Sequence, residues 1–216
     1  MIQSDKELKD LAIAYINRGD ASEHKGDHDR AIADYNEAIW LSPFPRAFSN
    51  RGIVYFNRKD YDRAIADFTE AIRLNPNIAY VFNDRAGAYK AKWAYEDDEY
   101  KAKEDLDHAI ADYSEVIRLD PKFTQAYVHR GRVLHGRKDY DRAIADYNDV
   151  IRLDPKAVAS YIDRGNAFYF KGDYDRAIGD YSEAIRLDPA DAGTFSCRGR
   201  THLKKENYAR AIADFT

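Results

Sequence analysis

Disulfides, targeting signals and membrane spans are all missing from this chain of 216 residues. Its only cysteine, Cys197, excludes a framework of internal disulfide bonds. The first residues, MIQSDKELKD, contain no apolar segment of signal-peptide length, and no window is long and apolar enough to span a membrane. We therefore expect a soluble protein, cytoplasmic by default, without a membrane partner.

Large clusters of one charge sign are also missing. The chain has 34 Lys and Arg against 38 Asp and Glu, with both signs interleaved along its length, and its formal net charge is −4. Nucleic-acid binders usually show basic patches and a high isoelectric point, whereas this chain has a pI of about 5.9. The pattern predicts a hydrated surface rich in ion pairs and no nucleic-acid partner.

Motifs of catalysis and metal binding are absent too. The sequence contains neither a glycine-rich phosphate loop nor a metalloprotease motif, and Cys197 has no histidine at a catalytic spacing. Asp20, His24 and His28 are spaced by four residues, as metal ligands on one helix would be. However, Gly26-Asp27 predicts a turn before His28. We expect no enzyme, no cofactor and no metal site.

The main positive feature is a short phrase, AIADY or a close variant, that occurs six times. Its first residues are Ala31, Ala64, Ala109, Ala143, Ala177 and Ala211, at intervals of 33, 45, 34, 34 and 34 residues. A regular period of this length is typical of a stack of supersecondary units, each too small to bury its apolar face alone.

Each copy has the pattern of two helices joined by a turn. In residues 124–157, apolar side chains recur at steps of three and four in both halves, which is the helical period. Asp139 lies between the halves, where it can cap the second helix, and Pro155 is expected to end that helix. Gly131 and Ala143 are small enough to let the two helices approach closely.

The copies resemble the tetratricopeptide repeat, whose signature combines aromatic, Gly, Ala and Pro positions. Residues 124–157 match it through Tyr127, Gly131, Ala143, Tyr147 and Pro155. The resemblance implies an all-α solenoid of antiparallel helix pairs, wound as a right-handed superhelix. We divide the chain into a helical extension (1–11), repeat 1 (12–44), repeat 2 (45–78), repeat 3 (79–123), repeat 4 (124–157), repeat 5 (158–191) and a truncated repeat 6 (192–216).

One departure from the family pattern recurs in every copy. Arg stands where the family has Leu before the Gly position, and Asp occupies the fourth place of the repeated phrase. In a hairpin that turns near Lys138-Asp139, Arg130 and Asp146 lie at the same height, which predicts an ion pair between the two helices. The alternative partner for Asp146 is Arg142, one turn earlier on the same helix, in an exposed and weaker pair.

Repeat 3 is eleven residues longer than its neighbours, and residues 90–108 contain no Gly, Pro, Ser or Asn. A floppy loop of that length usually contains such residues, so we expect a lengthened hairpin that turns near Glu96-Asp97-Asp98-Glu99. Two interpretations stay open: an acidic, hydrated helix extension, or a docking knob formed by Trp93, Tyr95 and Tyr100.

The two ends of the array differ. Ser4 and Glu7 form a capping-box pattern that predicts a helix start. Repeat 6 stops at Phe215-Thr216, within its second helix and without a polar cap. We expect either a segment of a longer array or self-association through this end, which would give a homo-oligomer.

The resemblance also implies a concave groove, lined by the first helix of each pair, that binds a peptide or protein segment. Residues of this chain on the matching face include Asp20, Glu23, Ile16, Arg46, Ile53 and Asp84. The side chains that we select as peptide-binding candidates are Asn17, Asn50, Phe56, Tyr80, Asn83, His129, Arg132, Asn166 and Tyr169. The asparagines offer a donor and an acceptor to a peptide backbone, as a row of amides does in some members of the family.

The charges of the groove residues nearly cancel, so they do not predict the partner's charge. The family's dicarboxylate clamp is not present, since only Asn50 agrees among its five positions in repeats 1–3. We predict a protein-interaction scaffold with an unidentified peptide or protein partner. The alternatives are a self-assembly module and the regulatory arm of a larger protein.

Overall fold

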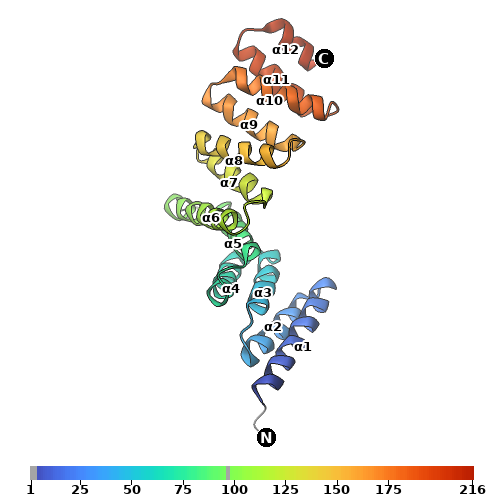
Figure 1. The fold of residues 1–216 in the computed structure, drawn as a ribbon, viewed down its shortest axis with the longest axis vertical. Coiled ribbons are helices and arrows are strands. Elements are labelled where there is room, and N and C mark those ends of the chain that lie inside the picture. Colours follow the sequence, from blue (N-terminus) through green and yellow to red (C-terminus); the bar gives the residue numbers. More distant parts are fainter. Residues whose placement is uncertain (1–3, 96–97) are drawn as a thin grey trace. The chain divides into compact units, whose positions relative to one another are not determined.

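The computed structural model describes residues 4–95 and 98–216, and the regular structure in these residues is entirely helical. The chain divides into two compact units, Met1–Asp120 and Pro121–Thr216. Consecutive helices pack as antiparallel pairs within each unit (Figure 1). The helices of unit 1 are α1 (Asp5–His24), α2 (His28–Leu41), α3 (Pro45–Asn57), α4 (Tyr61–Leu74), α5 (Ala79–Trp93) and α6 (Glu99–Leu119). Those of unit 2 are α7 (Thr124–Gly136), α8 (Tyr140–Leu153), α9 (Val158–Lys171), α10 (Tyr174–Leu187), α11 (Ala192–Lys204) and α12 (Tyr208–Phe215).

Side-chain caps and left-handed turn residues separate the two helices of a pair. The carboxylate of Asp139 accepts a hydrogen bond from the Arg142 amide at the start of α8, as expected. Ser4 and Glu7 form the expected capping box at the start of α1. His28 is the first residue of α2, so it does not share a helix with Asp20 and His24. Tight turns between paired helices contain a residue at positive φ, such as Gly172, whose φ is 87°.

The core of each hairpin forms where an aromatic side chain of the second helix lies on a glycine of the first. A Cβ atom added to Gly52 would lie 2.8 Å from Cε1 of Phe68. The same contact recurs for Gly131 with Tyr147 and for Gly165 with Tyr181. In repeat 3, Ala86 occupies the place of this glycine, and both Ala86 and Tyr113 are buried. Small residues therefore set the closeness of the helices.

The predicted Arg–Asp pair is present in all six hairpins. The pairs are Arg18–Asp34, Arg51–Asp67, Arg85–Asp112, Arg130–Asp146, Arg164–Asp180 and Arg198–Asp214. Each is bidentate: Nε of Arg51, for example, donates to Asp67 at 2.8 Å and Nη2 donates at 2.7 Å. The alternative partner is excluded, because Arg142 donates to its own cap, Asp139.

Four of the paired arginines also join consecutive repeats within a unit. The remaining terminal nitrogen, Nη1, donates to a polar side chain on the second helix of the preceding repeat. These bonds are Arg51 to Asn36, Arg85 to Thr69, Arg164 to Asn148 and Arg198 to Ser182. One guanidinium thus connects three helices, which a leucine at this position could not do.

A second inter-repeat ion pair lies at the turn end of the hairpins. It joins a basic residue near the end of a first helix to an Asp in the first turn of the preceding second helix. The pairs are Arg58–Asp29, Lys92–Asp62, Lys171–Asp141 and Lys205–Asp175. Because the acidic partners are exposed, each pair adds little stability and mainly favours one stacking register.

The long third repeat is a lengthened hairpin, as expected. Its second helix, α6, has 21 residues, whereas α4, α8 and α10 have 14. Of the expected turn, Glu96 and Asp97 lie outside the described residues, and Asp98 caps α6 by accepting from the amides of Tyr100 and Lys101.

Candidate functional site

The first helices of consecutive repeats are neighbours within each unit: α1, α3 and α5 in unit 1, and α7, α9 and α11 in unit 2. Their exposed side chains form the face on which the sequence predicts ligand binding. Unit 1 has two hollows on this face, one polar and one apolar.

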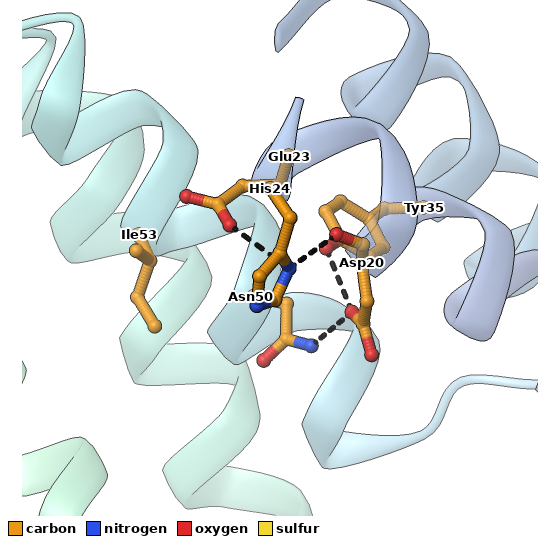
Figure 2. A pocket seen from close by; sticks show the side chains of 6 residues that line it. All are labelled: Asp20, Glu23, His24, Tyr35, Asn50 and Ile53. Carbon is orange, nitrogen blue, oxygen red and sulfur yellow. Dashed lines mark hydrogen bonds and ion pairs between the residues drawn. The ribbon is translucent and has the colours of Figure 1, made fainter. Parts of the chain in front are cut away.

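The polar hollow is centred on Asp20 (Figure 2). Its Oδ1 accepts hydrogen bonds from the Tyr35 hydroxyl at 2.8 Å and from Nδ2 of Asn50 at 2.7 Å. Its other oxygen accepts from Arg46. Nδ1 of His24 lies 2.7 Å from the Asp20 carbonyl oxygen, and Glu23 and Ile53 complete the lining. Burial and the bond to Asp20 raise the pKa of Tyr35, so its hydroxyl stays a donor.

The apolar hollow lies between α1, α3 and α5. Its lining is Ile13, Ile16, Phe44, Pro45, Arg46, Ile78 and Tyr80. We expected Ile16 to face a ligand, but only 2% of it is exposed, because it packs in the core with Ala12 and Tyr35. Arg46 borders both hollows, since it lines the apolar one and donates to Asp20 in the polar one.

Asp84 on α5 is the most perturbed carboxylate on this face. It is half-buried, and desolvation raises its pKa from 3.8 to about 6, although the hydrogen bond from Asn83 acts in the opposite direction. Nδ2 of Asn83 lies 3.4 Å from Oδ1 of Asp84, which is a weak hydrogen bond. The side-chain oxygen of Asn83 is buried without a hydrogen-bond partner.

The first-helix face of unit 2 has different polar contacts. Nε of Arg132 donates to Asp163 at 2.8 Å, and the Tyr181 hydroxyl donates to Asn166 at 2.8 Å. His135 makes edge contacts with the rings of Tyr140 and Phe170, and burial lowers its pKa. This histidine is therefore neutral at physiological pH.

The four candidate asparagines do not share one position in the repeat. Asn17 and Asn50 directly precede the paired arginines Arg18 and Arg51, whereas Asn83 precedes Arg85 by two residues. Asn166 instead follows its paired arginine by two residues. The four asparagines therefore do not follow one line along the first helices, since consecutive residues on a helix point about 100° apart. Asn50 and Asn166 also bond within the protein.

The other candidates lie at several depths. Tyr80 and Arg132 are exposed, whereas Phe56, His129 and Tyr169 are half-buried. Trp93, Tyr95 and Tyr100 of the predicted knob are all exposed. The ring of Tyr95 stacks on Tyr61 with centroids 6.0 Å apart, which anchors one of the three. Asp20, Arg46 and Asp84 lie on the predicted face but are not among the selected candidates. The bonds of Asp20 to Arg46 and Asn50 join different repeats, which a single repeat does not reveal.

Four segments of the chain match family models. Residues 12–44, 45–78 and 98–158 match models described as tetratricopeptide repeat, and residues 165–206 match one described as TPR repeat. The chain belongs to the tetratricopeptide-repeat (TPR) family. A comparison with curated proteins finds no match for this TPR chain.

Solved structures confirm the TPR fold. MamA protein shares 22% sequence identity at a TM-score of 0.73, covering 85% of this chain and 94% of its own. YrrB, described as a TPR protein with an unusual peptide-binding site, shares 22% sequence identity at a TM-score of 0.71, covering 90% of this chain and 92% of its own. A tetratricopeptide repeat protein from Parabacteroides merdae shares 19% sequence identity at a TM-score of 0.75, covering 95% of this chain and 77% of its own. At these identities the likeness concerns the fold alone.

TPR membership supports a general role as a protein-interaction scaffold, and such proteins are typically non-catalytic. Within residues 4–95 and 98–216, every helix is too short or too polar to cross a membrane.

Replacement of Asp84 by Asn is expected to stabilise the protein at neutral pH. The pKa of Asp84 is about 6 in the folded protein and near 3.8 when unfolded, so the folded state loses stability as pH rises through this interval. Its titratable neighbour is Tyr113, whose pKa is raised by burial and which stays neutral throughout. The thermal midpoint of Asp84→Asn should exceed that of the wild type at about pH 7.5 and converge with it near about pH 4. Equal midpoints at both pH values would contradict the assigned shift.

Proposed function

We propose that this TPR chain binds an extended peptide or protein segment along the face of its first helices. The candidate contacts are Asn17, Asn50, Phe56, Tyr80 and Asn83 in unit 1. In unit 2 they are His129, Arg132, Asn166 and Tyr169. YrrB, described as having an unusual peptide-binding site, is a comparison of the same fold that is consistent with this function.

The observation that carries the proposal is the pair of hollows in unit 1. One is polar and the other apolar, and Arg46 belongs to both. A segment that crosses them can form hydrogen bonds at Asn50 and bury an apolar side chain beside Tyr80. Protein interfaces combine these two kinds of contact around a few aromatic anchors.

A photoreactive phenylalanine at position 80 tests this function. We expect it to cross-link to one short, continuous segment of a partner, mapped by mass spectrometry. The matched control carries the same probe at Ala66, an exposed residue on the second helix α4, and should not cross-link to that segment. The double variant Asn50→Ala/Asn83→Ala should weaken the cross-link at position 80. Equal cross-linking from positions 66 and 80 would refute binding on the first-helix face.

Self-association is the second candidate, because α12 exposes the apolar side chains of Tyr208, Ile212 and Phe215. Sedimentation velocity over a range of protein concentrations separates the two functions. Segment binding predicts a sedimentation coefficient that does not depend on concentration, whereas self-association predicts one that rises with it.

A further inference from the structure

Polar residues of neighbouring first helices are matched between repeats 1 and 2 and between repeats 4 and 5. Asp20 follows the paired Arg18 by two residues, and it accepts from Asn50, which directly precedes the next paired arginine, Arg51. In unit 2, Arg132 follows Arg130 by two residues and donates to Asp163, which directly precedes Arg164. The same two positions thus supply a donor and an acceptor in each case.

Asp84 lacks such a partner. Asp84 directly precedes Arg85, so the position that would pair with it is the one two residues after Arg51 in repeat 2. This position holds Ile53, which has no polar atom in its side chain. Among the residues that the structure describes, no ion pair involves Asp84, and its one hydrogen bond is the weak contact with Asn83. A half-buried carboxylate therefore lies on the binding face without a cation.

The second helix of repeat 2 explains why no donor is present. In repeats 1 and 5, a buried tyrosine hydroxyl extends to the first-helix face, where it donates to Asp20 and to Asn166. The equivalent residue of repeat 2 is Phe68, which has no hydroxyl. Phe68 and Ile53 belong to one apolar cluster, so this part of the face provides no donor to a neighbouring carboxylate.

A second acceptor beside Asp84 also lacks a donor. Oδ1 of Asn83 is buried and forms no hydrogen bond. Buried acceptors without partners are uncommon in folded proteins and are costly. The half-buried Asp84 carboxylate, beside a second acceptor without a donor, favours a ligand that brings N–H donors and a positive charge.

We propose that the segment bound by unit 1 presents an arginine side chain to Asp84, next to an apolar side chain in the hollow beside Tyr80. Tyr80 precedes Asp84 by one helical turn on the same face of α5, or about 6 Å along the axis. This distance is about two residues of an extended chain. A guanidinium carries its five donors in a planar fork, so two of its N–H groups can pair with the Asp84 carboxylate, whereas a lysine ammonium is a compact point charge.

The charges around the hollows agree with a basic side chain. Asp20 is already neutralised by Arg46, whereas Asp84 has no such partner. A bound cation lowers the pKa of Asp84, because its charge offsets the desolvation that raises this pKa in the free protein. The inference rests on the proposed function and names the chemistry of its ligand.

Selection from a displayed library of random decapeptides on the full chain tests the inference. We expect enriched peptides to share an arginine two residues from an apolar side chain. The variant Asp84→Asn should lose the preference for arginine and keep the apolar preference. The control Glu37→Gln removes one carboxylate from an exposed position on α2 and should select the same peptides as the wild type.

A double-mutant cycle with one selected synthetic peptide gives the magnitude. Replacing its arginine by Gln, or Asp84 by Asn, should each weaken binding by about 10- to 100-fold. The two changes together should cost little more than either alone. Peptides that are enriched without arginine, or additive losses, overturn the inference and leave the proposed function intact. A library that yields no enriched peptide at all overturns both.

Discussion

Replacing Arg51 by Ala is expected to lower the free energy of unfolding by about 3 to 5 kcal/mol, the cost of removing one partner from a buried ion pair. The Arg51 side chain is 19% exposed and its partner Asp67 is 8% exposed. The substitution leaves the Asp67 carboxylate buried without a cation and also removes the bond to Asn36 on the preceding repeat. The guanidinium lies 5.7 Å from the ring centre of Phe48, so packing is lost as well.

Urea denaturation followed by circular dichroism measures this loss. Arg18→Ala is the matched control, because Arg18 makes the same bidentate pair but is 56% exposed, and we expect a smaller effect. The apolar double variant Arg51→Met/Asp67→Leu should recover most of the stability, since well-packed apolar residues can replace a buried pair. Equal losses for Arg18→Ala and Arg51→Ala would show that burial does not determine the cost.

The hairpin framework could be predicted from the sequence because it depends on contacts between residues that lie equally far from the turn of one hairpin. Arg130 and Asp146 are 16 residues apart across one turn, and the hairpin geometry alone places them together. The repeat boundaries stay predictions. The binding face was harder to predict, because its side chains are paired across repeats. Ile16 was placed on the surface, whereas the register of α1 against α2 buries it beside Tyr35.

Asp84 is the clearest example of a site feature that the sequence pattern does not predict. Its raised pKa comes from desolvation, which depends on how the repeats pack and is not visible in residues 79–123 alone. The repeated residues stabilise the stack in the same way in each hairpin. The exceptions to the repeat, such as Ile53 and Phe68 beside an acidic residue, are therefore where ligand chemistry should differ between repeats.

The second large loss of stability is expected for Gly52→Ala, at a close contact between paired helices. The new Cβ would lie 2.8 Å from Cε1 of Phe68 and 3.0 Å from its Cδ1. Phe68 is 1% exposed, so its ring cannot move away without disturbing the core. Overpacking of this kind costs roughly 1 to 3 kcal/mol, which exceeds the gain of about 0.5 to 1 kcal/mol from replacing a helical glycine by alanine.

The third repeat supplies a control of opposite sign. A Cβ added to Gly87 has no atom within 4 Å, so Gly87→Ala should stabilise the protein by about 0.4 to 1 kcal/mol, measured by the same urea titration. Shortening the ring in Gly52→Ala/Phe68→Leu should recover part of the loss at Gly52. If Gly52→Ala and Gly87→Ala shift stability in the same direction, helix propensity rather than the contact with Phe68 decides the outcome. A difference in sign would instead show that the glycine sets the distance between α3 and α4.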